Sequence, residues 1–459
     1  MSTPVPANTA TDVDGPVDLQ VDVLVIGAGP SGLGTAAFLE QARRAGSIPS
    51  AVRCVVVDGA DEPGGYCRTV EHNGFVFDYA GHFFHFRDPA MQAFVLDRLP
   101  ADGLRTVQRR ARVIDVDGEE VGFPYQQHIG ELSPAAFRAC LVDLYDAERA
   151  STTTTTTTTF KQWLRSKLGA SLCERFLEPY NEKLYATDLD TLDATCMGRF
   201  FPTVRFADVM QALRAGGDDV DRGYNATFTY PPKGAATVIA GLQRDLDPRD
   251  LLLNERVVGV DVERKIAVTT KRRIRWRALV SSAPLPQLLS LAKLDVDRAA
   301  FSWNRVLVFN LGFDKKARAD AHWIYVARAD VPFYRVGFYD VIVGGDRASL
   351  YVEIGLPQTG DVDAVDLAAL REQTLAGLRT LGFIDDTHNL VAEHHVIMDP
   401  AYVHLTPRAL TTTTAALATL RAHDVHSIGR YGAWTYCSIE DNLIAARDVV
   451  TGPLTALLR

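Results

Sequence analysis

Three glycines near the amino terminus form the first group of residues whose spacing indicates chemistry. Gly27, Gly29 and Gly32 occur in the pattern GxGxxG, directly after the apolar segment VDVLVI. In such a turn the first glycine allows a tight bend, the second lets the backbone approach a pyrophosphate, and the third lets a helix pack on a strand. The amino end of the helix that follows, which contains Ser31, would stabilise the phosphate charge. This pattern predicts a dinucleotide site.

An acidic residue follows at the end of the next apolar segment. Asp58 comes directly after CVVV and stands where a ribose hydroxyl needs an acceptor. Strand, glycine turn, helix and second strand make a βαβ unit, which favours a parallel sheet. The alternative is a glycine-rich turn with a purely structural role. It is disfavoured because strand, helix and acid are all in place.

Two arginines in aromatic surroundings form a second group. Arg430 lies in GRYGAWTY, and Arg335 ends VPFYR. Guanidinium forks fit phosphate oxygens, and each charge-assisted hydrogen bond contributes roughly 1.5 to 3 kcal/mol. Because the chain carries a formal net charge of -9, such cations would have to be gathered in one pocket. The alternative is that both arginines are ordinary surface or ion-paired residues.

Composition narrows the class of protein. The chain has 459 residues, of which 47% are hydrophobic and 23% charged, so it is a globular protein with room for two or three packed units. Its acidity argues against a general nucleic-acid binder. The first 19 residues lack the features of a signal peptide, and no window is apolar enough to span a membrane. Six cysteines without a CxxC pair predict reduced thiols and no metal site. A cytoplasmic protein without membrane contact is expected.

Other segments must position these groups. Helical spacing from Ser133 to about Leu213 predicts an inserted helical domain, and alternating apolar runs between 300 and 396 predict a largely antiparallel sheet. The expected fold is α/β, with discontinuous domains. The expected boundaries are a flexible tail at 1–19, a Rossmann-type domain at 20–122 with 225–299 and 425–459, a helical insert at 123–224, and an antiparallel sheet substrate domain at 300–424. Poly-threonine at 151–159 predicts a surface loop, and 216–223 a mobile segment.

The spacing after Asp58 brings in a first resemblance. Five residues separate this acid from Gly64 and Gly65. An acid followed at this spacing by two glycines resembles the FAD-binding proteins of the glutathione-reductase and amine-oxidase type. The resemblance implies FAD rather than NAD, and an FAD-binding role for the Rossmann-type domain.

Later stretches resemble the UDP-galactopyranose mutases, in the order in which that family has them. They are FDYAGHFFH at 77–85, FPYQQH at 123–128, EPYNEKLY at 178–185, WIY with VPFYR at 323–335, and GRYGAWTY at 429–436. The resemblance runs from Val23 to about Val449, although it is strong only in these stretches. It implies that the catalytic residues are His82, Arg335 and Arg430, with His85 on a second matching position.

The same resemblance implies two sets of binding residues. The cofactor-binding set is Gly27, Gly29, Ser31, Gly32, Asp58, Gly64, Gly65, His82, Val257, Gly429, Ile439 and Glu440. The substrate-binding set is Phe123, Gln126, Asn181, Tyr185, Arg199, Tyr325, Arg335, Tyr402, Arg430 and Tyr436. A helix beginning near Ser438 would point its amino end at the flavin.

Two stretches depart from the family pattern. Tyr185 stands where the mutases usually have a tryptophan, and Glu440, Asp441 and Asn442 stand where they commonly have Asp-His-Ser. A smaller aromatic is still a plausible stacking partner for a base. The departures leave open which base and which sugar such a protein would use.

The resemblance implies an FAD-dependent nucleotide-sugar mutase. It would interconvert pyranose and furanose forms of UDP-galactopyranose or a related nucleotide-diphosphate sugar through a reduced-flavin N5-sugar adduct, with no net redox change. NADPH or NADH is a candidate reductant, and the oligomeric state stays open. The first alternative is an FAD-dependent oxidoreductase of the amine-oxidase or protoporphyrinogen-oxidase type. The second is a non-catalytic binding protein. A hydrolase is not indicated, because neither GxSxG nor HExxH occurs.

Overall fold

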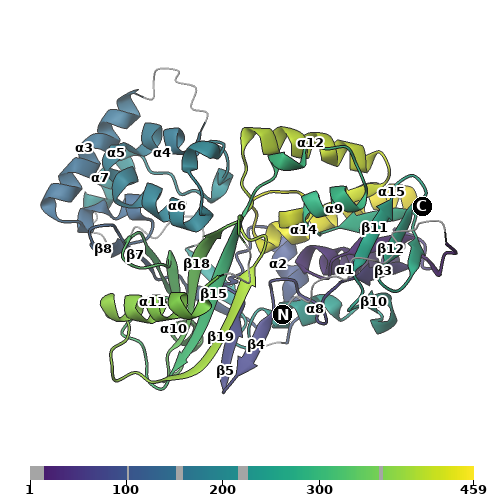
Figure 1. Cartoon of the computed structure of the whole chain (residues 1–459), viewed down its shortest axis with the longest axis horizontal. Helices are drawn as coiled ribbons and strands as arrows, with labels where there is room; N and C mark the ends of the chain where they lie inside the picture. The colour runs from purple at the N-terminus through teal and green to yellow at the C-terminus, as the bar shows by residue number, and fades with distance from the viewer. Residues whose placement is uncertain (1–14, 101–102, 151–158, 215–225, 361–364) are drawn as a thin grey trace.

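The computed structural model describes residues 15–100, 103–150, 159–214, 226–360 and 365–459 (Figure 1). Most of the expected tail, the threonine run at 151–158 and the glycine-rich segment at 216–223 lie outside these ranges. Within them, no helix is both long enough and apolar enough to cross a membrane.

A parallel sheet carries the GxGxxG turn. Its strand order is β10-β3-β2-β14-β20, and every neighbouring pair is parallel. Its strands are β2 (Val23–Ile26), β3 (Cys54–Val57), β10 (Leu251–Leu252), β14 (Ala278–Ser281) and β20 (Val425–Ser427). Residues of β2, β3 and β14 are all buried, as expected of strands covered on both faces. The predicted βαβ unit is confirmed, and the sheet draws strands from three distant parts of the chain.

Two helices from opposite ends of the chain pack together beside this sheet. They are α1 (Pro30–Arg44) and α14 (Ile439–Val449). A Cβ atom on Gly34 of α1 would lie 2.9 Å from Leu443 Cδ2 of α14. The close approach places the carboxyl-terminal segment next to the amino-terminal turn (Figure 1).

A second, mostly antiparallel sheet has the strand order β19-β15-β18-β17-β16-β7-β8. Only its β16–β7 pair is parallel within the described residues. The strands are β7 (Ala111–Ile114), β8 (Glu120–Gly122), β15 (Asn304–Phe313), β16 (Trp323–Val326), β17 (Arg335–Phe338), β18 (Ser349–Pro357) and β19 (Leu390–Met398). Helix α11 (Leu367–Thr380) contributes Leu375 and Leu378 to the buried cluster on one face. Strands β7 and β8, which the sequence placed with the Rossmann-type domain, belong to this sheet.

The helical periods expected after Ser133 are present. The helices are α3 (Pro134–Ala150), α4 (Phe160–Leu168), α5 (Ala170–Leu172), α6 (Glu178–Tyr185) and α7 (Phe206–Arg214). The fold class is therefore confirmed: an α/β protein with a Rossmann-type part, a group of inserted helices and a largely antiparallel sheet (Figure 1).

Helix α6 is fixed firmly to the second sheet. A Cβ atom on Gly355 of β18 would lie 2.0 Å from the carbonyl oxygen of Lys183, so only glycine allows this approach. The Lys183 ammonium donates hydrogen bonds to the carbonyl oxygens of Arg328 (3.0 Å), Val331 (3.0 Å) and Phe333 (2.6 Å). These carbonyls lie between β16 and β17, so helix and sheet form one continuous wall.

The remaining elements complete the two parts. The helices are α2 (Pro89–Leu96), α8 (Ala236–Gln243), α9 (Leu285–Leu291), α10 (Tyr339–Val343), α12 (Pro407–Arg421), α13 (Gly429–Gly432) and α15 (Thr455–Leu458). The strands are β1 (Leu19–Gln20), β4 (Thr69–His72), β5 (Phe75–Asp78), β6 (Arg105–Gln108), β9 (Thr227–Tyr230), β11 (Val257–Asp261), β12 (Ile266–Thr269) and β13 (Arg273–Arg275).

Candidate functional site

A cavity of about 1020 Å³ lies where the Rossmann-type part, the second sheet and the inserted helices meet. Its wall includes Gly29 and Asp58 from the first part, Arg335 from β17, Asn181 from α6, and Arg430 from the carboxyl-terminal segment. The two groups of residues that the sequence singled out therefore share one cavity.

The glycine turn forms one end of this cavity. Gly27 has φ +100°, which favours glycine. A Cβ atom on Gly32 would lie 1.8 Å from the carbonyl oxygen of Gly27, so the third glycine lets α1 pack on the turn. A Cβ atom on Gly29 would lie 3.9 Å from Gly65 Cα, so two glycines face each other there. Helix α1 begins without a side-chain cap or an acidic residue in its first turn, which leaves its amino end available to a phosphate.

Asp58 stands beside the turn and lines the cavity. Its Oδ2 accepts a hydrogen bond from the Ala28 N–H (2.7 Å), and its Oδ1 accepts one from the Ala60 N–H (2.8 Å). Carboxylate oxygens carry further lone pairs, so the fixed carboxylate can still accept from a ribose. The turn and this acid together fit the pyrophosphate and adenosine ribose of a dinucleotide.

The other predicted cofactor residues fall into two groups. Ser31, Gly65, Val257 and Ile439 line the cavity, as do Gly27, Gly29, Asp58 and His82. The cavity wall does not include Gly32, Gly64, Gly429 or Glu440. The Gly64 N–H donates to the Ala28 carbonyl (2.8 Å), which ties the two glycine loops together.

Glu440 holds the chain segment that leads into α2. Its buried carboxylate accepts hydrogen bonds from the N–H groups of Arg87 (2.7 Å) and Asp88 (2.8 Å). Asp441 forms a capping box with Ser438. Both carboxylates lie in the first turn of α14. They offset the positive end of the helix dipole, which the sequence analysis predicts to face the cofactor.

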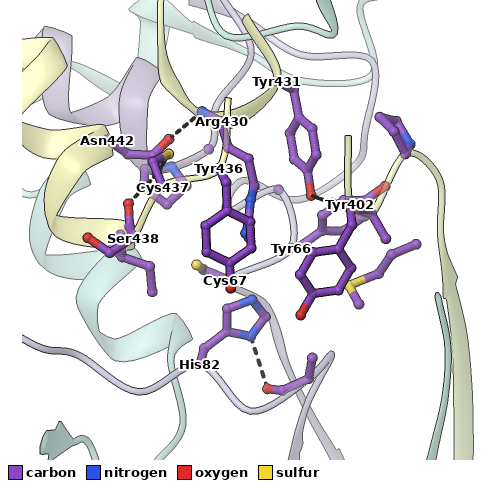
Figure 2. A pocket seen from close by; sticks show the side chains of 18 of the residues that line it. Tyr66, Cys67, His82, Tyr402, Arg430, Tyr431, Tyr436, Cys437, Ser438 and Asn442 are labelled. Carbon is purple, nitrogen blue, oxygen red and sulfur yellow. Dashed lines mark hydrogen bonds between the residues drawn. The ribbon is translucent and has the colours of Figure 1, made fainter. Parts of the chain in front are cut away.

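His82 points into the cavity (Figure 2). Its Nδ1 lies 3.0 Å from the carbonyl oxygen of Ala80, and because a carbonyl only accepts, Nδ1 carries the proton and Nε2 is the acceptor. Burial lowers the pKa of His82 to about 4. His85 also lines the cavity, and burial lowers its pKa to about 4. Both rings are therefore neutral near pH 7 and serve as hydrogen-bonding groups rather than cations.

Buried histidines predict acid sensitivity. Burial lowers the pKa of His82, His85 and His322 to about 4, whereas an unfolded-chain histidine titrates near 6.5. Between these values the unfolded state binds more protons. The free energy of unfolding therefore decreases as the pH is lowered, by up to roughly 1.4 kcal/mol per pH unit for each such histidine. Burial raises the pKa of Asp78 to about 6. Below about pH 6 this one carboxyl therefore takes up a proton more readily in the folded state, which partly offsets the loss of stability from the histidines.

We expect urea unfolding midpoints at pH 7.0, 6.0 and 5.0 to fall progressively. His322 is 2% exposed. His322→Gln should make the midpoint depend less on pH, because it removes one of these buried titrating groups. His72→Gln, at an exposed position of β4, is the matched control and should leave the slope unchanged. Equal slopes for His322→Gln and the original chain would contradict the assignment.

Arg430 stacks on two tyrosine rings (Figure 2). Its guanidinium carbon lies 5.4 Å from the ring centre of Tyr402 and 4.8 Å from that of Tyr436. Within the described ranges, no carboxylate lies within ion-pair distance of this guanidinium. These ring contacts use none of the N–H groups of the guanidinium, so those groups are left for an anion.

Arg335 lies opposite Glu353 on neighbouring strands. Its Nε and Nη2 donate to the two carboxylate oxygens at 2.8 and 2.6 Å. Glu353 is 1% exposed, and both residues line the cavity. Arg335 is thus both an ion-paired residue and a cavity residue, and its Nη1 is not used in the pair. It can hold an anion with one edge while Glu353 fixes the other.

Removing the Glu353 charge should separate these two roles. We expect Glu353→Gln to lower the free energy of unfolding by about 1 to 3 kcal/mol, because the Arg335 charge loses its partner. The same change should tighten binding of inorganic pyrophosphate by about 1 kcal/mol, or roughly fivefold. Urea unfolding and isothermal titration calorimetry measure the two effects.

Glu393→Gln is a matched control for this change. Glu393 pairs with Arg371 at 2.8 Å and is not part of the cavity wall. This variant should leave pyrophosphate affinity unchanged. If Glu353→Gln left pyrophosphate affinity unchanged, Arg335 would have only a structural role.

The predicted substrate residues mostly line the cavity. Those at the wall are Phe123, Gln126, Asn181, Arg199, Tyr325, Arg335, Tyr402, Arg430 and Tyr436. Asn181 donates through Nδ2 to the Leu177 carbonyl (2.6 Å), and its buried Oδ1 has no partner among the described residues. Such an acceptor suits a ligand N–H or hydroxyl. Arg199 forms an ion pair with Asp441.

Tyr185 lies outside the cavity wall. It is 1% exposed, and its ring contacts that of Tyr402 edge-on with centroids 5.8 Å apart. The structure therefore places this residue behind Tyr402, as support for a wall residue.

Glu353 and Asn442 are among the cavity residues that the sequence does not predict. Glu353 is the one charged residue in the apolar run SLYVEIGL, and that isolation was an available signal. In the sequence Asn442 stands out only as a departure from the family pattern, and the structure places it in the cavity wall.

Comparisons with known proteins give the same architecture. A model of an NAD(P)-binding Rossmann-like domain matches residues 25–99. The structure is similar to that of a reduced UDP-galactopyranose mutase, with a TM-score of 0.84 and 22% identity, over 94% of this chain and 96% of that chain. A protein from Exiguobacterium sp. 255-15 assigned as a protoporphyrinogen oxidase gives a TM-score of 0.74 at 15% identity, over 96% of this chain and 100% of that one. Cyclohexylamine oxidase from Brevibacterium oxydans gives 0.68 at 17% identity, over 97% and 100% respectively. The resemblance to the mutases is confirmed at the level of fold, which the chain shares with the mutase and oxidase structures.

Proposed function

We propose that this chain is an FAD-dependent nucleotide-sugar mutase that interconverts pyranose and furanose forms of UDP-galactopyranose or a related nucleotide-diphosphate sugar without net redox change. The observation that carries the proposal is Arg430, a cavity cation stacked on Tyr402 and Tyr436 with no carboxylate partner among the described residues. An unpaired cation in a protein of net charge -9 is well suited to an anionic ligand.

FAD fits the other end of the same cavity. The paired glycines and Asp58 would hold its pyrophosphate and ribose, and Val257, His82 and Ile439 would line the remainder of the cofactor site. When bound and reduced, the flavin supplies the electron pair for covalent catalysis at the anomeric carbon. NADPH or NADH is the proposed source of the reducing electrons.

The side chains of the chain itself orient and retain the substrate. Arg430 and Arg335 would donate to the diphosphate and hold it within reach after it leaves the sugar, which favours its return over hydrolysis. The acceptor Oδ1 of Asn181 would take a hydrogen bond from the ligand. The neutral His82 would accept one at Nε2, so it orients a donor without adding a second charge.

Product analysis tests the proposal. FAD-loaded protein is reduced chemically under argon and mixed with UDP-galactose, UDP-glucose or dTDP-galactose, and the nucleotide sugars are separated by ion-exchange chromatography. We expect one of them to yield an isomer of the same mass with no consumption of reductant. The oxidised protein should be inactive.

The competing function is an FAD-dependent oxidoreductase of the amine-oxidase or protoporphyrinogen-oxidase type. In its favour, many aromatic side chains line the cavity, among them Phe83, Phe123, Tyr180 and Trp323. Bleaching of the oxidised flavin by an amine or a porphyrinogen, with no isomerisation of any nucleotide sugar, would establish the oxidoreductase and overturn the mutase.

A further inference from the structure

Asn442, near the start of α14, is hydrogen-bonded at both ends of its side-chain amide. Its Oδ1 accepts from the Ser31 hydroxyl (2.7 Å) and from the Arg430 N–H (3.0 Å). Its Nδ2 donates to the Ser438 carbonyl (2.6 Å) and lies 3.4 Å from Cys437 Sγ. Figure 2 shows Asn442 beside Arg430, Cys437 and Ser438, all of which line the cavity. One side chain thus joins the glycine turn, the arginine segment and the helix start.

The orientation of this amide follows from its partners. The Arg430 N–H can only donate and the Ser438 carbonyl can only accept, so the oxygen must face Arg430 and the nitrogen must face Ser438. The Ser31 hydroxyl can turn to suit and donates to the oxygen.

The backbone next to Arg430 has little freedom to move. Gly429 has φ +79°, and a Cβ atom there would lie 2.2 Å from Ser31 Oγ and 2.7 Å from Asn442 Oδ1. The peptide that carries Arg430 is therefore pressed against the first turn of α1. Because the guanidinium stands at the end of a long side chain, a small rotation of this peptide displaces it from the rings of Tyr402 and Tyr436.

We propose that Asn442 is a positioning residue that couples the dinucleotide turn to Arg430, so that cofactor binding prepares the anion site. The proposal rests on the proposed function for the identity of the two ligands. A phosphate held at the amino end of α1 fixes the turn containing Ser31. Ser31 then fixes Asn442, and Asn442 fixes the peptide of Arg430. By reciprocity, an anion on Arg430 strengthens cofactor binding by the same factor.

The test measures UDP affinity by isothermal titration calorimetry, with and without bound FAD. In the original chain we expect FAD to tighten UDP binding by roughly tenfold, within the usual range of coupling between sites. In Asn442→Ala the ratio should fall to about twofold or less, with most of the loss in the FAD-loaded form. Asp448→Asn, at an exposed position of the same helix, is the control and should keep the full ratio.

A double-mutant cycle keeps the proposal testable if Asn442→Ala folds poorly. Ser31→Ala breaks the link from the α1 side, and we expect it to lower the ratio to a similar extent. The double variant should show the same ratio of UDP affinities as either single variant, because both substitutions remove the same connection. Full coupling in Asn442→Ala, or strictly additive losses in the cycle, would overturn the proposal.

The two proposals fail in different ways. UDP binding that is coupled to FAD and depends on Asn442, without any isomerisation, would leave the positioning role intact and remove the mutase activity. If the protein isomerises a nucleotide sugar and Asn442→Ala does not change the coupling ratio, the mutase activity stands and the positioning role of Asn442 is overturned. If FAD-loaded protein binds neither UDP nor pyrophosphate, both are overturned.

Discussion

Arg430→Ala is expected to weaken UDP binding to the FAD-loaded protein by roughly 10- to 150-fold, the equivalent of about 1.5 to 3 kcal/mol for one charge-assisted contact. The physical reason is that Arg430 is a cavity cation without a carboxylate partner in the described part of the chain, while Arg335 already shares its charge with Glu353. Retention of FAD should change little, because the substituted side chain lies on the far side of the Asn442 link. Calorimetry with UDP and absorbance of bound flavin after gel filtration measure the two quantities.

Two further variants sharpen this result. Arg430→Lys keeps the charge and loses the planar fork, so we expect an intermediate affinity. Arg379→Ala removes an arginine of α11 that pairs with Asp386 away from the cavity, and it should bind UDP as the original chain does. Equal losses of UDP and FAD in Arg430→Ala would show that this arginine supports the cofactor site. Unchanged UDP affinity would place the anion site elsewhere.

The dinucleotide turn could be predicted because its determinants are local. Gly27, Gly29 and Gly32 sit between a buried strand and a helix, and Asp58 closes the next strand. Each of these signals depends on residues within one βαβ unit, so sequence spacing is enough to place them. The cavity position of Arg430 came from a family resemblance, since nothing in its own neighbourhood shows what it faces.

The connections between distant segments could not be predicted. Ser31 and Asn442 are separated by 411 positions, and their hydrogen bond exists only because α14 packs on α1. The pairing of Arg335 with Glu353 depends on the register between β17 and β18, which the alternation of apolar residues alone does not fix. The strand register therefore determines that Arg335 is ion-paired.

Tertiary packing also overrode local propensity. Thr411 and Thr414 lie inside α12 although threonine is a poor helix former. Their hydroxyls donate to the carbonyls of Pro407 (3.1 Å) and Leu410 (2.9 Å), one turn back. The face that carries Ala409, Thr413 and Leu420 is buried. Burial of one face thus holds a helix that composition disfavours.

Gly32→Val is expected to abolish FAD binding. A Cβ atom at this position would lie 1.8 Å from the carbonyl oxygen of Gly27 and 3.1 Å from Val25 Cγ1. The oxygen belongs to the turn itself, so it cannot move aside without opening the phosphate site. We expect a loss of at least about 3 kcal/mol in the free energy of unfolding, as found for severe overpacking. Thermal melting and flavin fluorescence of the purified protein measure the two effects.

Gly452→Val is the matched control for this substitution. Apart from its two chain neighbours and the surrounding helix backbone, no heavy atom of the described structure lies within 4 Å of a Cβ atom built on Gly452. The variant should bind FAD normally and melt close to the original temperature. If Gly32→Val retained FAD, α1 would lie further from the turn than it does in this structure, and the phosphate would be bound elsewhere. If both valine variants lost FAD, the effect would come from valine in a helix and not from the contact between α1 and the turn.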